Sequence, residues 1–226
     1  MNGAWLRDQR RRKEWTQEQA AARLGVSQTY LSLLENGRRP LSQRLAQRLE
    51  RKFAVPPTAL PMAMNSGLHN AQSLVEGLAA LGYPGFAHFN PRRRVNPAQL
   101  LFDALRMHDL EPRLGEALPW VAWRYCDLDW DWLVREARLH DLQNRLGFVV
   151  GLASQVAERR EQQVTAEALA VVERRLEPSR LAREDTLCHE SMTQAERRWL
   201  RERRSTQAQH WNLLTGLVPD HLSYAA

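Results

Sequence analysis

Four residues near the N-terminus carry side chains that can read the edges of base pairs, and helical spacing places them on one face. They follow Ser27, a residue type that caps a helix by accepting a backbone hydrogen bond. Glutamine pairs with adenine through two hydrogen bonds, serine and threonine bond to several bases, and leucine contacts the thymine methyl group. The four candidates for base contact are Gln28, Thr29, Ser32 and Leu33. Gln28 is the first choice among them because a bidentate pair discriminates well between bases.

Two short helices joined by a tight turn are expected to position this face. Thr16 can cap a first helix over about 17–24, and Gly25 permits the sharp turn that leads to a second helix over about 28–35. Such a pair is a helix-turn-helix, whose second helix is suited to entering a DNA major groove. The residues that should point inward are Ala20, Ala21, Leu24, Val26, Leu31 and Leu34.

Further helices should support this pair on both sides. One is expected over about 3–14 with Leu6 buried, a fourth from Ser42 to Phe53 with leucines at a spacing of four, and a short last turn at 58–60. Asn36 and Gly37 should end the second helix of the pair, because glycine tolerates a left-handed backbone.

Residues 6–60 resemble the lambda-repressor-like, or Xre-family, DNA-binding domain. The resemblance lies in the string LRDQRRRKEWTQEQAAARLGVSQTYLSLLENGRRP, followed by LSQRLAQRLERKFAVPPTAL. It implies a five-helix DNA-binding domain in which Arg10, Gln17 and Asn36 touch the DNA backbone. It also implies a homodimer on a pseudo-palindromic double-stranded operator. Leu33 departs from the family, in which polar base-reading residues are common at that position.

The excess positive charge lies on the same segment. Residues 1–60 hold 12 Lys and Arg against 5 Asp and Glu, whereas residues 61–226 hold 20 Arg against 21 Asp and Glu. A phosphate backbone favours this arrangement through counterion release, and backbone N–H groups at helix N-termini also hold phosphate. The other candidates for phosphate contact are Thr16, Ser27, Tyr30, Arg38, Arg39 and Arg44.

Several other classes of function find no support in the sequence. No apolar run approaches about 18 residues and no apolar signal core is present, so a cytoplasmic protein without membrane contact is expected. Cys126 and Cys188 lack metal-ligand spacing, and neither metal nor cofactor is expected. Nucleotide-binding glycine loops, HExxH and GxSxG are absent, which argues against an enzyme. Since no lysine follows Lys52, the Ser–Lys self-cleavage of some repressors of this family cannot operate.

The sequence predicts an all-α protein with three parts. Residues 1–62 form the DNA-binding domain, residues 63–69 a linker, and residues 70–226 a larger helical domain for partner binding, dimerisation or sensing. No strand alternation is seen. In the third part, helices are expected near 74–81, over 100–110, before Cys126, after a cap at Asp127 or Asp129, and over 139–160, 165–178, 193–204 and 211–217.

Three smaller features of this helical domain have predicted roles. The tryptophans at 120, 123, 130 and 132 are expected to be core residues, and Gly147 and Gly151 to allow close helix packing. The segment Cys188-His189-Glu190 matches no specific metal or nucleophile spacing, so a surface or capping role is expected.

The leading hypothesis is a dimeric transcription regulator that represses by blocking polymerase. Its helical domain would bind a partner, such as the cognate toxin of an antitoxin that represses its own operon. The alternative is a regulator that responds to a small ligand or peptide. The segment from Asp103 to Asp141 has nine acidic residues against five arginines, which suits a basic partner, whereas a tryptophan-lined pocket would suit a ligand.

Overall fold

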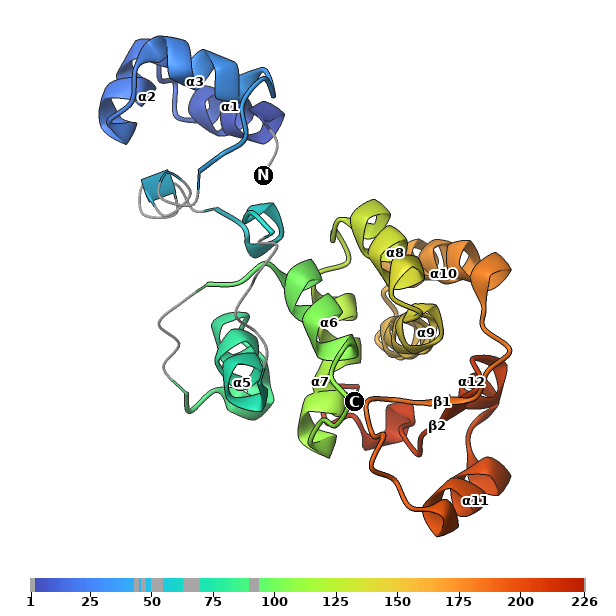
Figure 1. Ribbon diagram of the computed structural model, residues 1–226. Helices are drawn as coiled ribbons and strands as arrows, with labels where there is room; N and C mark the ends of the chain where they lie inside the picture. Colours follow the sequence, from blue (N-terminus) through green and yellow to red (C-terminus); the bar gives the residue numbers. More distant parts are fainter. Residues whose placement is uncertain are drawn as a thin grey trace. The chain divides into compact units, whose positions relative to one another are not determined.

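The computed structural model describes residues 3–42, 45, 48–49, 55–62, 70–89 and 94–225. It divides into two compact units, Met1–Met64 (unit 1) and Asn65–Ala226 (unit 2). In Figure 1 the helices of unit 1 are blue and those of unit 2 run from green to red. The expected linker at 63–69 and the predicted phosphate contact Arg44 lie outside the described residues.

Unit 1 is helical. Its elements are α1 (Gly3–Arg12), α2 (Gln17–Leu24), α3 (Gln28–Glu35) and a 3-10 turn, η1 (Pro57–Ala59). Leu45, Arg48 and Leu49 are also helical, and the rest of the fourth expected helix lies outside the described residues. Buried apolar side chains hold these elements together. They lie on each element or directly beside it: Leu6, Ala20, Ala21, Leu24, Leu31, Leu34, Leu45, Leu49, Val55 and Leu60.

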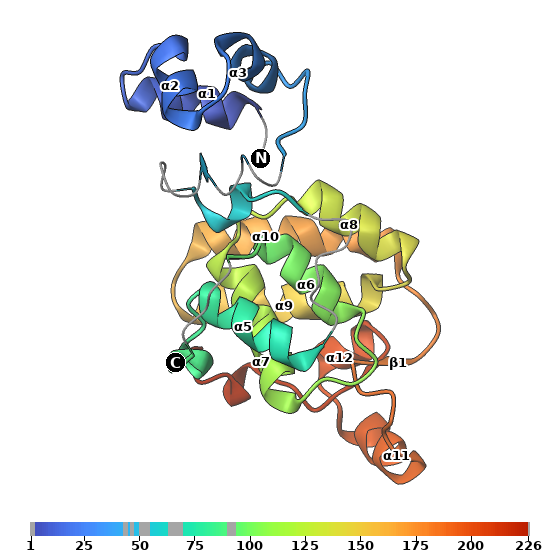
Figure 2. The same ribbon diagram turned by 60° about the vertical axis from the view of Figure 1, so that its left-hand side comes forward.

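Unit 2 is built around one buried helix, α9 (Gln143–Arg159), on which α7 (Pro112–Arg124) and α10 (Gln163–Leu176) pack from different sides (Figures 1 and 2). Because α9 touches other elements all round, residues from Gln143 to Ser154 are buried without a break. The remaining elements are α5 (Ala71–Ala80), η2 (Pro84–Phe86), α6 (Pro97–Leu105), α8 (Trp130–Leu139), η3 (Glu177–Ser179), α11 (Gln194–Arg203), α12 (Thr206–His210) and η4 (Pro219–His221).

Glycine in α9 permits the closest packing in this unit. A Cβ atom added at Gly147 would overlap the indole ring of Trp211, which is fully buried. At Gly151 an added Cβ would meet the side chains of Gln207 and Glu173. The expected close packing at these two glycines is confirmed. The core role expected for the tryptophans holds for Trp120, which is buried, whereas those at 123, 130 and 132 are half-buried.

Two sequence predictions for unit 2 are wrong. A helix does not begin at Leu139: α8 ends there, Asp141 has a φ of 58°, and α9 begins only at Gln143. The expected last helix over 211–217 is absent, because Asn212 has a φ of 51° and the chain then forms a strand. This strand, β2 (Leu213–Leu214), pairs in parallel with β1 (Asp185–Thr186), and sequence alternation cannot reveal strands of two residues.

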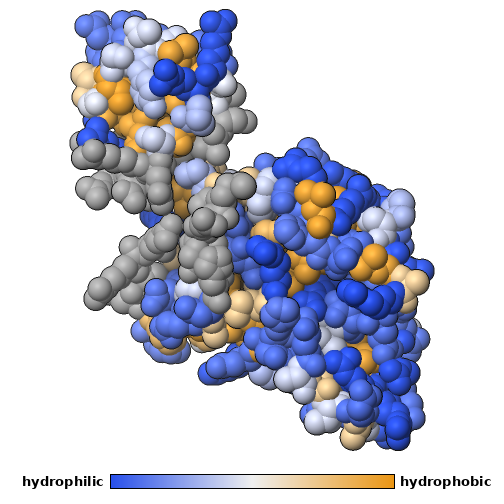
Figure 3. All heavy atoms as spheres, viewed as in Figure 1, coloured by the Kyte–Doolittle hydropathy of each residue, from blue (hydrophilic) through white to orange (hydrophobic). Residues whose placement is uncertain are grey.

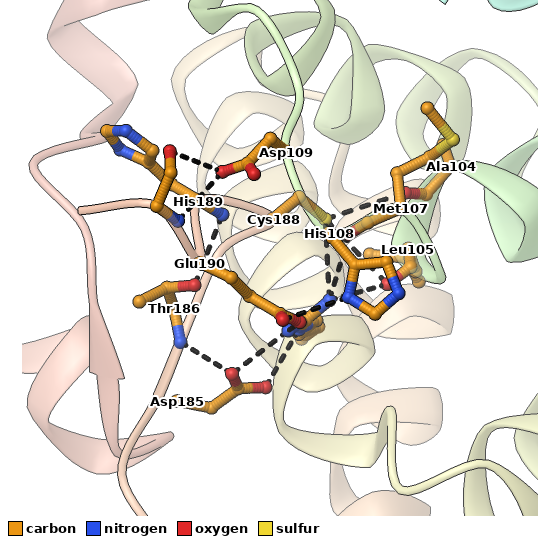
Figure 4. A network of polar contacts seen from close by, with 12 residues as sticks. Ala104, Leu105, Met107, His108, Asp109, Asp185, Thr186, Cys188, His189 and Glu190 are labelled. Atoms are coloured by element: carbon orange, nitrogen blue, oxygen red, sulfur yellow. Dashed lines mark hydrogen bonds and ion pairs between the residues drawn. The ribbon is translucent and has the colours of Figure 1, made fainter. Parts of the chain in front are cut away.

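Arg145 joins segments of unit 2 that are far apart in the sequence. Figure 4 shows residues of these segments, among them Leu105, Asp185 and Glu190. The Arg145 guanidinium donates to both carboxylate oxygens of Asp185 at 2.8 and 2.9 Å, to the carbonyl of Leu105 at 2.9 Å and to Glu190 at 3.2 Å. Cys188 lies beside it, and burial raises the pKa of its thiol to about 12. A protonated, enclosed thiol is a poor nucleophile.

The surface of unit 2 is mainly hydrophilic in the view of Figure 3, with isolated hydrophobic areas. The large apolar side chains that are exposed among the described residues are Phe89, Leu139, Val164, Val171 and Trp199. Within the described part of the chain, no helix combines the length and the apolar character that crossing a membrane requires.

Candidate nucleic-acid interface

Local hydrogen bonds determine where α2 and α3 begin and how they are joined. The Thr16 hydroxyl accepts from the backbone N–H of Gln19, whose side chain accepts from the N–H of Thr16, both at 3.1 Å. The Ser27 hydroxyl accepts from the N–H of Tyr30 at 3.1 Å. Gly25 has a φ of 63°, the left-handed conformation that only glycine adopts at little cost. The predicted caps and turn are therefore confirmed.

The outward face of α3 carries the four predicted base-contact residues. Gln28 and Thr29 are exposed, while Ser32 and Leu33 are half-buried one turn further along. Leu31 and Leu34 fill the opposite face and are buried. This face therefore presents polar groups at its N-terminal end, the end from which helix-turn-helix proteins contact base edges. The contacts themselves stay predictions.

A buried carboxylate, Glu35, holds α1, α2 and α3 together. It accepts hydrogen bonds from Arg10 Nε at 2.7 Å, Arg10 Nη2 at 3.0 Å and Gln17 Nε2 at 3.0 Å. Arg10 also donates to the Trp15 carbonyl at 3.0 Å, and Arg7 donates to the carbonyl of Glu35 and to the side chain of Asn36. The fork of Arg10 thus fixes the angle at which α1 meets the end of α3.

The ionisation of this group follows from its surroundings. Burial raises the pKa of the Glu35 carboxyl, but hydrogen bonds from Arg10 and Gln17 and the charges of Arg10 and Arg7 outweigh it, so the net pKa lies below the ordinary value of 4.5. The hydrogen bond to Glu35 raises the pKa of Arg10 in turn. Both groups are charged at neutral pH, as a compensated buried ion pair requires.

The predicted phosphate contacts occupy two kinds of position. Arg10 and Gln17 are engaged with Glu35 inside unit 1, and the Arg10 side chain is only 13% exposed. The others that the structure describes lie at the surface: Thr16, Ser27, Asn36, Arg38 and Arg39 are exposed, and Tyr30 is half-buried. Arg39 lies over the ring of Tyr30 at 5.9 Å. All of these phosphate contacts stay predictions, and Arg38 and Arg39 are the charged side chains best exposed to make them.

Residues 6–60 match the family model described as helix-turn-helix. This segment is a helix-turn-helix of the Xre type. The match supports a DNA-binding transcription regulator and covers residues of unit 1 only. In comparisons with curated proteins and with solved structures, no protein matches the chain.

Sequence reasoning missed the role of Glu35. A signal was present, because a residue four positions after Leu31 and next to Leu34 belongs to the inward stripe of the helix. A carboxylate on such a stripe needs a cationic partner, and Arg10 lies on the neighbouring helix. Only the packing of α1 against α3 could identify Arg10 as that partner.

Proposed function

We propose that this protein is a transcription regulator that binds a specific DNA operator as a dimer and represses by blocking polymerase, without enzymatic activity. The observation that carries this proposal is the exposed polar N-terminal end of α3, with Gln28 and Thr29, on a segment that matches the helix-turn-helix model. Arg38 and Arg39 are exposed beyond the end of the same helix, where phosphates would flank the groove.

The test begins with duplexes selected by the wild-type protein from a random library. Gln28→Ala should bind the selected duplexes with weaker preference, losing about 1–3 kcal/mol of discrimination at one base pair. Gln194→Ala is the matched control, because Gln194 is an exposed glutamine of α11 in unit 2. A selection that enriches no sequence, or a Gln28→Ala profile identical to the wild type, would contradict sequence-specific readout through this face.

For unit 2 we favour a protein partner over a small ligand. Trp120 and Trp211 are buried in the core, where the latter fills the space left by Gly147, so they support packing rather than a tryptophan-lined pocket. The exposed carboxylates of the 103–141 segment, among them Asp109, Glu111 and Asp127, support a basic partner.

In the antitoxin version of this proposal the neighbouring gene encodes that partner. Its product should arrest growth when expressed alone and should be neutralised when this protein is co-expressed. A neighbouring transporter or metabolic enzyme, together with release of operator DNA by a small molecule, would favour the ligand-responsive alternative instead.

A further inference from the structure

Hydrogen bonds connect the side chains of Arg7, Asn36 and Ser32 in unit 1. Arg7 on α1 donates from Nη2 to the side-chain oxygen Oδ1 of Asn36, the residue that ends α3. Asn36 donates from Nδ2 to the hydroxyl oxygen of Ser32 at 3.4 Å. Ser32 lies four residues earlier on α3, on the face that carries the predicted base contacts. This Arg7–Asn36–Ser32 relay therefore links α1 to a candidate base-reading side chain.

The chemistry of Arg7 determines which way the Asn36 amide faces. A guanidinium has five N–H donors and no acceptor, so the Asn36 atom that it contacts has to be the oxygen. Arg7 is itself held in place, because Nη2 also donates to the Glu35 carbonyl at 3.3 Å and Nε lies 3.9 Å from the Glu35 carboxylate. The amide nitrogen of Asn36, which can only donate, is thereby directed toward Ser32.

The direction of these bonds leaves the Ser32 hydroxyl with a hydrogen to donate. Its oxygen accepts from Asn36, and among the described residues the hydroxyl hydrogen has no acceptor of its own. An acceptor on DNA would satisfy that hydrogen. A donor on DNA would leave it without a partner at an interface from which water is largely excluded, and unsatisfied donors there are costly.

We infer that Arg7 is a positioning residue for DNA recognition: through Asn36 it makes the Ser32 hydroxyl a donor, so the DNA group opposite Ser32 is a hydrogen-bond acceptor. The acceptors in the major groove are purine N7, guanine O6 and thymine O4, whereas the amino groups of adenine and cytosine are donors. A phosphate oxygen is also an acceptor. This inference rests on the proposed function, because it concerns the base-reading face of α3.

Two-dimensional NMR of the full chain tests the relay without DNA. The side-chain amide signals of Asn36 should shift in Ser32→Ala and in Arg7→Ala, because each variant removes one partner of that amide. Arg11→Ala is the matched control: Arg11 is an exposed arginine of α1, and its loss removes the same charge. Unchanged Asn36 signals in either test variant would overturn the inference, as would equal shifts in the control.

Competition among single-site variants of a selected duplex identifies the group opposite Ser32. Ser32→Ala should lose preference at one base pair by about two- to tenfold, the net contribution of one hydrogen bond. Replacing the acceptor atom there, for example purine N7 by a 7-deaza analogue, should weaken wild type by the same factor and leave Ser32→Ala unaffected. If the acceptor is a phosphate oxygen, a single methylphosphonate linkage should give this pattern instead. Absence of both patterns would overturn the inference.

Asn36→Asp should reverse the direction of the relay. The new carboxylate still accepts from Arg7 but cannot donate, so the Ser32 hydroxyl would donate to it and present only lone pairs to DNA. The analogue or methylphosphonate that weakens wild type should then have no effect, and at a base pair the preference should move to an amino group. The added negative charge should weaken binding to all sequences alike. A wild-type response of this variant at the Ser32 position would contradict the relay.

Arg7→Ala separates positioning from a general loss of charge or stability. It should weaken the response at the Ser32 position more than elsewhere, whereas Arg11→Ala should weaken all sequences alike. A uniform loss in both variants would reject a positioning role for Arg7.

The same measurements keep this inference separate from the proposed function. A wild-type selection that enriches no sequence would reject the proposed function, while the NMR signals would still decide whether the relay forms. Enrichment by wild type, together with a wild-type response of Asn36→Asp, would reject the inference and leave the proposed function standing.

Discussion

Glu35 connects the three helices of unit 1. Its carboxylate is buried and receives hydrogen bonds from Arg10 on α1 and Gln17 on α2. The removal of one member of such a pair leaves an uncompensated charge in the interior, which costs far more than the pair itself contributes. The position of the recognition helix relative to α1 therefore depends on this single side chain.

Glu35→Gln should destabilise unit 1 by about 3–5 kcal/mol, because it leaves the Arg10 guanidinium without its counter-charge. Native-state hydrogen exchange, read on peptides from α1, α2 and α3, measures the change for this unit alone. Glu18→Gln is the control: Glu18 is exposed on α2 and should change stability by no more than about 0.5 kcal/mol. Equal protection in both variants would show that the pair does not stabilise the unit.

The same carboxylate should make unit 1 sensitive to acid. Because its pKa in the folded state lies below the ordinary 4.5, its contribution to stability is complete above about pH 4.5 and is lost as the pH falls through the folded-state value. Exchange rates corrected for intrinsic chemistry should rise over this window in wild type. The rise should be smaller in Glu35→Gln, and an identical acid response in both would assign it to other groups.

At the scale of helices, the sequence best predicts those features that depend only on residues close together in the chain. Thr16, Ser27 and Asp129 each cap a helix, as expected, because a cap needs only a backbone N–H three residues away. The outward face of α3 was likewise derived from helical spacing. Contacts between residues far apart in the sequence were not predicted, as the end of α12 shows. Trp211 packs against α9, and the chain leaves helical geometry at this residue.

The features that the sequence did not predict depend on ion pairs between residues that are far apart in the chain. Arg145 finds Asp185 40 residues away, and Glu35 finds Arg10 25 residues away. From local periodicity alone, Arg10 and Arg145 are indistinguishable, since each is a cation within a helix. Only tertiary packing distinguishes a buried clamp from a solvated charge.

The packing of α9 leads to a prediction about glycine. Gly147→Ala should destabilise unit 2 by about 1–3 kcal/mol, because the new methyl group would overlap the Trp211 ring and force it to move. This cost exceeds the gain in helix propensity of up to about 1 kcal/mol. Urea unfolding followed by circular dichroism measures the change.

Gly115→Ala in α7 is the matched control for that experiment. Nothing lies within 4 Å of a Cβ added at Gly115, so the helix should gain about 0.5–1 kcal/mol. A stabilising Gly147→Ala would show that Trp211 has room to shift, and the close packing of α9 would then not depend on glycine.

The whole molecule separates its charge by unit. Residues 1–64 hold 12 Lys and Arg against 5 Asp and Glu, and residues 65–226 hold 20 Arg against 21 Asp and Glu. Unit 1 also has its own buried cluster, made entirely of residues from Leu6 to Leu60. The electrostatic attraction to DNA should therefore belong to unit 1, and unit 2 should contribute through association and partners.

Residues 65–226 expressed alone should fold as a helical protein with no measurable affinity for DNA. The reason is that α9 is enclosed by elements of the same unit, so its burial needs nothing from residues 1–64. Circular dichroism should give a helical spectrum with a cooperative unfolding transition, and a fluorescently labelled duplex should show no binding at low salt.

The full chain should bind that duplex with an affinity that falls steeply with salt, by about 0.9 logarithmic units per logarithmic unit of salt for each phosphate neutralised. A disordered spectrum would mean that the two units do not fold independently, and salt-dependent binding by residues 65–226 would place part of the DNA surface outside the helix-turn-helix.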